Sequence, residues 1–261
     1  MNKMTIKLGM EIDKSISIMA DMENTGHMCV IGSTGSGKTV AVLYMIYNLF
    51  NLPIPIRLYI GDFKKSGDYK GISMEFAEFG DVVQLIEDFY EEFQSTPEDS
   101  PEIKILLLDE YAGFIIWLLQ QDKKKCEEIK GKISEVLMIG RSRHMYIWSI
   151  QQRISAQLYP SGVGAIDNFQ ILIGLGHLSV DSRRSLFAGE HLDNVEFEKN
   201  FHPKKGQGLC LIDGQALKAI QIPLIADKEL LKALLRKKAN LPDGGTYGAD
   251  ALAQERGGDG I

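Results

Sequence analysis

The sequence predicts an α/β fold in which a mostly parallel sheet is covered by helices on both faces. Continuous apolar runs of strand length alternate along the chain with longer stretches of helical periodicity. Such uninterrupted strands are typical of parallel sheets, because helices bury both of their faces. With 261 residues and 44% hydrophobic content, the chain is long enough for one large domain with a substantial core.

The expected elements follow one another in a regular order. Strands are predicted at Met28–Ile31, Arg57–Asp62, Ile103–Asp109, Met145–Ile150, Phe169–Leu175 and Leu209–Ile212. Helices are predicted at Lys38–Phe50, Phe76–Phe93, Tyr111–Gln120, Cys126–Gly140, Val180–Phe187 and Asp227–Lys238. The apolar residues of Thr5–Met19 predict a short N-terminal β lead-in. The composition after Leu241 turns rich in glycine, which predicts a flexible tail over residues 242–261.

Composition sets mild limits on partners and compartment. The net charge is −6, so no general basic field indicates a nucleic-acid partner, although a local basic loop would not register in this total. The cysteines lie far apart without metal-site spacing, which suggests buried thiols in a reducing compartment. We recognise no secretion signal and no apolar stretch long enough to span a bilayer. We therefore expect a cytoplasmic protein whose membrane attachment, if it has one, comes through a partner.

The most informative motif is a glycine-rich turn between the first core strand and the helix after it. It consists of Gly32, Ser33, Thr34, Gly35, Ser36, Gly37, Lys38 and Thr39, and it fits G-x-x-x-x-G-K-[ST]. Glycines permit positive φ and close backbone approach, so successive N–H groups converge on phosphates at the helix N-terminus. We expect Lys38 to reach the β- and γ-phosphates and the Thr39 hydroxyl to ligate Mg²⁺. This phosphate loop predicts nucleoside triphosphate binding.

A second triphosphate signature ends the apolar run Ile105–Leu108, where Asp109 and Glu110 follow at the end of a strand. A buried strand would deliver both carboxylates to the edge of the sheet where ligands of open α/β sheets bind. Asp109 is expected to hold Mg²⁺ directly or through water, and Glu110 to polarise an attacking water as general base. A strand that ends in surface acids is common by itself. Together with the phosphate loop, the pair predicts an Mg²⁺-dependent ATPase.

Further segments resemble the FtsK/SpoIIIE DNA translocases of the FtsK–HerA superfamily. They are His27–Lys38, Asp109–Ala112, Gly140–His144, Gln151–Ser155, Asp181–Arg183 and Gly206–Leu209, after a lead-in with Leu8, Gly9 and Asp13. They follow the family's order over residues 8–213. The resemblance implies a RecA-like P-loop NTPase core at residues 27–241, preceded by the β lead-in at residues 1–26. It also implies a homo-hexameric ring that moves double-stranded DNA without sequence specificity, at the expense of ATP.

The resemblance assigns roles to three more residues. Gln152 corresponds to a polar sensor that contacts the γ-phosphate or the attacking water, a task that suits an amide because it both donates and accepts. Arg141 lies where the superfamily has a finger arginine that reaches the neighbouring subunit's site. Arg183 is placed near the phosphates or a subunit contact. For both arginines, a solvated surface charge is the alternative.

The DNA contacts are expected in the loop that follows the second core strand. Lys64, Lys65 and Lys70 of this loop, which also holds two aromatic residues, would track phosphates in a salt-sensitive manner. An ordinary charged loop is the alternative. The run Lys123–Lys125 is instead predicted to be the solvated start of a helix.

Departures from the family narrow the expected role. Ile154 and Phe63 stand where the family has proline, and the stretch around Gln120–Lys125 is longer than usual. We recognise no membrane-spanning N-terminus and no C-terminal winged-helix module, so a septal chromosome pump is not expected. We predict a motor for conjugative transfer of a mobile element, working with conjugation or relaxase partners. A viral genome-packaging ATPase and a secretion-type ATPase that acts on protein are the alternatives. Glu110, Gln152 and Arg141 argue against a small-molecule kinase, and the missing L-S-G-G-Q against an ABC-type ATPase.

Overall fold

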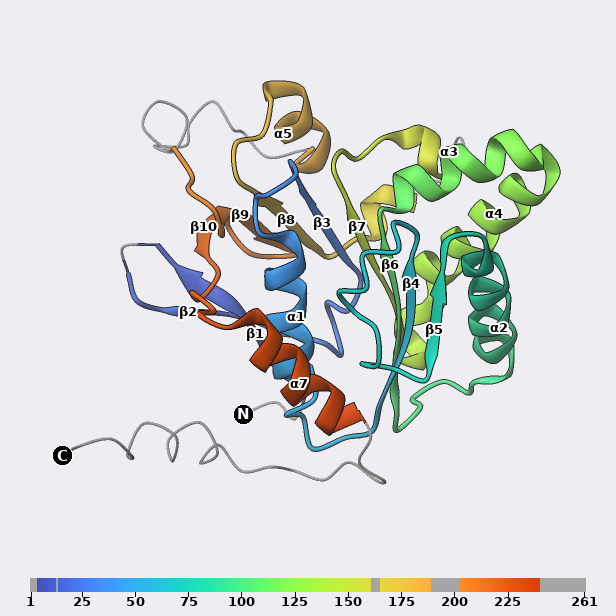
Figure 1. The fold of residues 1–261 in the computed structure, drawn as a ribbon, viewed down its shortest axis with the longest axis horizontal. Helices are drawn as coiled ribbons and strands as arrows, with labels where there is room; N and C mark the ends of the chain where they lie inside the picture. The colour runs from blue at the N-terminus through green and yellow to red at the C-terminus, as the bar shows by residue number, and fades with distance from the viewer. Residues whose placement is uncertain (1–3, 13, 161–164, 189–201, 240–261) are drawn as a thin grey trace.

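A computed structural model describes residues 4–12, 14–160, 165–188 and 202–239 (Figure 1). The predicted tail at residues 242–261 lies outside the described residues, as do residues 1–3 and 13 of the lead-in and 240–241 of the expected core. The domain boundaries at 26/27 and 241/242 therefore stay predictions. No helix in the described part of the chain combines the length and the apolar character needed to cross a membrane.

One ten-stranded sheet with the order β2-β1-β10-β9-β8-β3-β7-β6-β4-β5 organises the molecule. Its strands are β1 (Thr5–Glu11), β2 (Ser17–Asp21), β3 (Met28–Gly32), β4 (Ile56–Asp62), β5 (Glu75–Glu78), β6 (Ile103–Asp109), β7 (Met145–Gln151), β8 (Ile171–Leu175), β9 (Gln207–Ile212) and β10 (Lys218–Gln221). All pairings from β8 through β3, β7, β6 and β4 to β5 are parallel. The pairings from β2 through β1, β10 and β9 to β8 are antiparallel. The mostly parallel sheet is confirmed, and it carries an antiparallel extension at one side.

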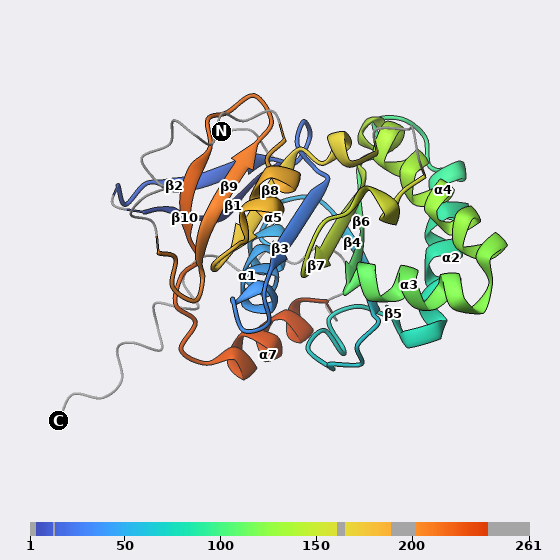
Figure 2. The same ribbon diagram turned by 90° about the horizontal axis from the view of Figure 1, so that it is seen from above.

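Helices cover both faces of this sheet, as predicted (Figures 1 and 2). The helices are α1 (Lys38–Leu49), α2 (Val82–Ser95), α3 (Tyr111–Gln121), α4 (Lys123–Ile139), α5 (Val180–Leu186) and α7 (Lys228–Ala239). Short 3₁₀ turns are η1 (Phe79–Asp81), η2 (Gly140–Arg143), η3 (Ala156–Leu158) and η4 (Ala165–Asn168). The α1 and α7 helices pack into one hydrophobic core, whereas α2, α3, α4 and α5 pack into another on the opposite face.

Alternate residues of each central strand enter the two cores, which explains why these strands are continuously apolar. In β6, Ile105 and Leu107 face the core of α1, and Leu106 and Leu108 face the core of α2, α3 and α4. All four are at most 2% exposed. Full burial of such a side chain contributes about 1.5–3 kcal/mol, so both faces of the strand support the fold.

Some predicted boundaries are wrong. The helix expected from Phe76 begins at Val82, because Phe76 pairs with Ile60 in strand β5 and Phe79 has a left-handed φ of 52°. The helix expected from Cys126 begins at Lys123, so the run Lys123–Lys125 is a helix start, as predicted. The Asp122 carboxylate accepts a hydrogen bond from the backbone N–H of Lys125 and so caps the helix there. The short strands β5 and β10 were not predicted.

The N-terminal lead-in forms strands, as expected, and is continuous with the rest of the sheet. Strands β1 and β2 pair with each other, and β1 also pairs with β10 through Met10 and Gln221. The three cysteines are free and buried, which agrees with the expectation from their spacing.

Candidate functional site: a nucleotide-binding edge

The parallel strands β3, β4, β6 and β7 end at one edge of the sheet, and the predicted nucleotide motifs meet there. The helix after β3 covers one face and the helix after β6 covers the other (Figure 2). Strand β7 lies between β3 and β6, so the polar residues that follow it separate the phosphate loop from Asp109. Ligands of open α/β sheets bind at such a change of helix direction.

The phosphate loop has the backbone conformation that its glycines predict. Gly35 and Gly37 have φ values of 83° and 104°, in the left-handed region that favours glycine. A Cβ atom at Gly32 would lie 2.4 Å from the backbone oxygen of Leu175, so no larger residue fits between β3 and β8 there. The Nζ of Lys38 donates to the backbone oxygens of Gly32 at 2.6 Å and Ser33 at 3.1 Å. The ammonium thus lies inside the loop, where burial lowers the pKa of Lys38.

The antiparallel part of the sheet is joined to this loop by a backbone hydrogen bond. The backbone N–H of Gly206, just before β9, donates to the backbone oxygen of Ser36 at 2.9 Å. The backbone N–H of Gly176, just after β8, donates to the backbone oxygen of Gln207 at 2.8 Å. The segment Gly206–Gly208 therefore makes its contacts through backbone atoms. These contacts give a structural reason for the resemblance seen at Gly206–Leu209.

Carboxylates crowd at the ends of β4 and β6. Asp62 and Asp109 are register partners on these adjacent parallel strands, and Glu110 follows directly. Burial, with the nearby charges of Asp62 and Glu110, raises the pKa of Asp109 to about 7. Asp62 is fully buried; one oxygen accepts from Ser66 Oγ and the Gly67 N–H, both at 2.9 Å, and Oδ1 has no hydrogen-bond partner among the described residues. An uncompensated acidic site of this kind favours a bound cation.

Glu110, the expected general base, lies between Lys64 and Gln152. The Nζ of Lys64 is 2.7 Å from Oε2 of Glu110, and the Nε2 of Gln152 donates to Oε1 at 3.3 Å. The neighbouring Gln151 is instead buried, with its Nε2 3.6 Å from the Cys29 sulfur. The structure therefore brings Gln152 and Glu110 together, with Lys38 near enough that the acids raise its pKa against the effect of burial.

The residues present fit a triphosphate with Mg²⁺. No group of three or more His, Cys, Asp and Glu side chains that could hold a metal ion occurs among the described residues. A P-loop site needs none, because Mg²⁺ there takes a Thr hydroxyl, one acid and phosphate oxygens. Thr39 begins α1, and Asp109 with the unpartnered oxygen of Asp62 supplies the negative charge. The donor set suits a hard cation that keeps several of its waters.

Arg141 does not reach this edge within its own chain. It lies in η2, which precedes β7, so it is at the opposite ends of the parallel strands from the phosphate loop. In the described part of the chain, its guanidinium makes no hydrogen bond or ion pair. It lines a pocket of about 490 Å³ together with Glu23, Glu98, Asp99, Met138, Ile139, Ser142, Arg143 and His144.

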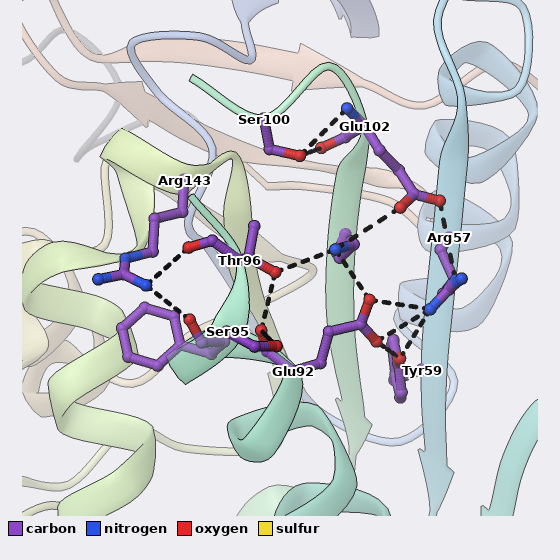
Figure 3. A network of polar contacts seen from close by, with 10 residues as sticks. Arg57, Tyr59, Glu92, Ser95, Thr96, Ser100, Glu102 and Arg143 are labelled. Carbon is purple, nitrogen blue, oxygen red and sulfur yellow. Dashed lines mark hydrogen bonds and ion pairs between the residues drawn. The ribbon is translucent and has the colours of Figure 1, made fainter. Parts of the chain in front are cut away.

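Arg143, two residues further on, is anchored instead. Its guanidinium donates to the backbone oxygens of Thr96 at 2.7 Å and Phe93 at 2.8 Å, at the C-terminal end of α2 (Figure 3). Beyond Thr96, the network continues to Lys104, whose Nζ is 2.8 Å from a carboxylate oxygen of Glu92. Figure 3 shows Glu92 between the helix end and Arg57 of β4, which it also contacts at 2.9 Å. This network fixes η2 against α2 and leaves Arg141 free to point elsewhere.

The remaining predicted residues occupy different surroundings. Arg183 lies in α5 after the end of β8, on the same edge as the phosphate loop. Lys65 lies with its Nζ 5.1 Å from the ring centroid of Phe79, and Lys70 is exposed. Lys64 was expected to contact DNA, and its side chain forms an ion pair with Glu110. No role was predicted for Asp62 or Gly206. The position of Asp62 at the end of an apolar strand could have indicated that it belongs to the site.

Comparison with known proteins agrees with this geometry. The model of the FtsK/SpoIIIE family matches residues 1–93. No match was found among curated proteins. The cytoplasmic domain of the type VII secretion ATPase EccC from Thermomonospora curvata is similar with a TM-score of 0.67 and 15% identity, over 92% of this chain and 31% of that chain. The chain thus spans about a third of the length of that relative.

Two other solved structures share the fold. The conjugation coupling protein TcpA of pCW3, in a monomer form with ATPγS, has a TM-score of 0.68 and 17% identity over 90% of this chain and 70% of that chain. The genome-packaging NTPase B204 of Sulfolobus turreted icosahedral virus 2, with ATPγS, has a TM-score of 0.50 and 13% identity over 78% of this chain and 100% of that chain. Residues 1–93 thus match the FtsK/SpoIIIE family model, and the described residues share the RecA-like P-loop fold of these ATPases.

Proposed function

We propose that the protein is an ATP-driven DNA translocase that cleaves ATP at the junctions of a homo-hexameric ring and serves conjugative transfer of a mobile element. The observation that carries the proposal is the contact of Gln152 with Glu110 beside Asp109 and the phosphate loop. This contact supports the proposal because it would bring the proposed polar sensor and general base to the γ-phosphate of a loop-bound triphosphate.

Each residue at this edge has a distinct task in hydrolysis. Lys38 exchanges its two backbone acceptors for phosphate oxygens when nucleotide binds, because a charged acceptor forms the stronger bond. Thr39 and Asp109 would hold Mg²⁺, which neutralises charge on the β- and γ-phosphates. Glu110 accepts the proton of the attacking water, and Gln152 orients that water against the phosphate.

The ring is proposed because Arg141 does not reach the triphosphate site of its own chain. This residue lies at the opposite edge of the sheet, next to the exposed apolar side chains Met138 and Ile139. Apolar surface around an unengaged arginine suits a contact between subunits. Arg141 would then reach the neighbour's triphosphate, where a planar guanidinium matches the charge of the transition state.

The choice of DNA rests on the lysines of the Phe63–Lys70 loop and on the likeness to TcpA, which is described as a conjugation coupling protein. Lys64, Lys65 and Lys70 provide exposed positive charge beside the nucleotide edge, which suits a phosphodiester backbone. The likeness to EccC and B204 keeps two alternatives open, a secretion-type ATPase that acts on protein and a packaging ATPase. We place the protein in the cytoplasm, where its three buried thiols stay reduced.

The test is ATP turnover by the purified full chain with and without duplex DNA. We expect Mg²⁺-dependent hydrolysis that rises with duplex DNA, with an apparent DNA affinity that falls steeply between low and moderate salt. Glu110→Gln should abolish turnover and keep nucleotide binding, whereas Lys38→Ala should lose both. Glu127→Gln on the exposed face of α4 is the matched control and should leave turnover intact. Hydrolysis that ignores saturating duplex DNA at every salt concentration would contradict the translocase and favour a protein substrate.

A further inference from the structure

Both carboxylate oxygens of Glu110 are engaged by side chains. Lys64 Nζ lies 2.7 Å from Oε2, and Gln152 Nε2 lies 3.3 Å from Oε1. The bond to Lys64 is charge-assisted and the shorter of the two, so it is the stronger restraint. A water that approaches Glu110 must compete with the ammonium of Lys64 for the carboxylate.

The Phe63–Lys70 loop, which carries this lysine, packs directly on the first turns of the helix that begins after Glu110. The Phe63 ring lies 5.9 Å from that of Trp117 in α3. A Cβ atom at Gly113 would lie 3.2 Å from Cγ of Glu110 and 3.4 Å from the Phe63 ring, so this glycine lets both side chains rest on the helix. The loop and the helix start are therefore close-packed, and a shift of one is felt by the other.

Backbone strain is concentrated at the same junction. Lys65, Phe79 and Glu110 have φ values of 55°, 52° and 60°, in the left-handed region that residues with a Cβ rarely adopt. The Phe63 and Phe79 rings stack at 5.1 Å, and Lys65 lies over Phe79. Such conformations persist only where surrounding contacts hold them, and they are found in segments that switch.

The other end of the loop is fixed to α7. Asp68, the loop's one acid, is 2.7 Å from Lys228 Nζ and 3.7 Å from Lys232 Nζ. The backbone oxygen of Lys70 accepts a hydrogen bond from Arg236 at 2.8 Å. Because α7 compensates the charge of Asp68, the exposed Lys65 and Lys70 have no uncompensated acid within the loop, and Lys64 pairs with Glu110 outside it. A polyanion is the ligand that this surface fits.

We propose that Lys64 is a positioning residue that holds Glu110 back until a phosphodiester chain takes over its ammonium group. DNA phosphate at the Phe63–Lys70 loop draws Lys64 away from Oε2, and Glu110 is then free to accept a hydrogen bond from the attacking water. Hydrolysis is thereby coupled to the presence of the polymer by an exchange of ion pairs. This inference rests on the proposed function and adds the device by which DNA would control turnover.

The size of the effect follows from the exposure of the pair. The Lys64 side chain is 49% exposed and that of Glu110 is 15% exposed, so the pair is partly screened by water. Such pairs contribute at most about 1 kcal/mol, which corresponds to a factor of about 5. A polymer phosphate can therefore displace Glu110, and removal of the lysine should raise turnover several-fold.

The experiment compares Lys64→Met, Lys64→Arg and wild type in the full chain, each assayed for ATP turnover with and without duplex DNA at low salt. Lys64→Met should raise the DNA-free kcat about 5-fold with little change in KM for ATP, and stimulation by DNA should shrink accordingly. Lys64→Arg keeps a cation on Glu110 and should restore the low DNA-free rate. Lys14→Met, which breaks an exposed pair with Glu11 of similar length, is the matched control and should change neither value.

Each result separates this inference from the proposed function. An unchanged or lowered DNA-free kcat in correctly folded Lys64→Met overturns the inference, whatever DNA does to the wild type. A raised kcat that survives in Lys64→Met/Glu110→Gln also overturns it, because the gain would not pass through Glu110. If the wild type ignores DNA but Lys64→Met is faster, the restraint on Glu110 stands and the choice of DNA as the partner is wrong.

Discussion

At the scale of single residues, the environment of a side chain decides its role more than its type does. Arg141 and Arg143 lie in the same short turn. The guanidinium of Arg143 donates to backbone oxygens at the end of α2, whereas Arg141 has no such anchor. The same holds for Gln151 and Gln152, of which one is buried and the other contacts Glu110. Neighbouring positions with identical chemistry therefore have to be separated by structure.

His27 gives a prediction at this scale. It is fully buried, its Nδ1 accepts a hydrogen bond from the Ile147 N–H at 3.0 Å, and burial with the charge of Arg141 lowers its pKa to about 3. The unfolded chain therefore binds a proton near pH 6.5 that the folded chain rejects. As pH falls from about 6.5 towards 3, we expect His27 to lower the free energy of unfolding by about 1.4 kcal/mol per pH unit.

The measurement is urea unfolding across this pH range for the wild type and His27→Gln. The raised pKa of Asp109 acts in the opposite direction, because its contribution to the free energy of unfolding is lost as pH rises towards 7. Both proteins contain Asp109, so this contribution cancels when their pH profiles are compared. The variant should show a shallower loss of stability on acidification. Parallel pH profiles would contradict a neutral, buried His27.

The positions of the candidate nucleotide-site residues at strand ends could be predicted from the sequence, because local signals encode them, and their roles stay predictions. The phosphate loop, Asp109, Glu110 and Gln152 each sit at the end of a strand that an apolar run announces. The Lys64–Glu110 pair and the Gly206 support for Ser36 join segments far apart in the chain, so no local pattern indicates them. The left-handed Phe79 gave no signal either, because aromatic residues rarely adopt that conformation.

At the scale of elements, the core strands and helices were predictable and two short strands were not. Strands β5 and β10 have four residues each and are exposed on part of their surface, so they carry little periodicity. They form because β4 and β9 offer unpaired backbone groups beside them. Tertiary pairing, rather than local propensity, creates these elements.

Helix α4 gives a prediction at this scale. Gly131 lies in its interior on the exposed face, and a Cβ atom there would meet nothing within 4 Å. Gly131→Ala should therefore stabilise the protein by about 1 kcal/mol, because alanine loses less backbone entropy in a helix. Thermal unfolding should show a Tm about 2–4 °C higher.

Gly208 provides the opposite case for the same substitution. A Cβ atom there would lie 2.0 Å from the backbone oxygen of Gly174, so Gly208→Ala forces β8 and β9 apart and should lower Tm. A higher Tm for Gly208→Ala would contradict the close packing described for β8 and β9. A lower Tm for Gly131→Ala would contradict the open surface described for α4.

At the scale of the whole molecule, the nucleotide edge and the Arg141 pocket lie at opposite ends of the parallel strands. In a ring where the Arg141 pocket of each copy faces the nucleotide edge of its neighbour, Arg141 would reach the neighbour's triphosphate. Such a heterologous contact closes into a ring when the rotation between copies allows it. In such a ring, sharing one site between two copies would also make hydrolysis depend on assembly.

The prediction at this scale concerns mixed assemblies. Arg141→Ala should lower turnover by a factor of about 10³ or more while nucleotide binding persists, since the arginine would act on the neighbour's triphosphate. In mixtures with wild type, turnover should fall below the line expected from wild-type content, because each variant copy disables an adjacent site. Lys124→Ala, an exposed cation at the other end of α4, should follow the proportional line. Strict proportionality for Arg141→Ala would exclude the shared site.

The bond from the Gly206 N–H to the Ser36 oxygen joins the antiparallel half of the sheet to the loop that would grip the triphosphate. The same sheet continues through β10 and β1 to the N-terminal hairpin. If binding of a triphosphate shifted β9, linkage would require that a change in the hairpin alter the affinity for the triphosphate by the same factor.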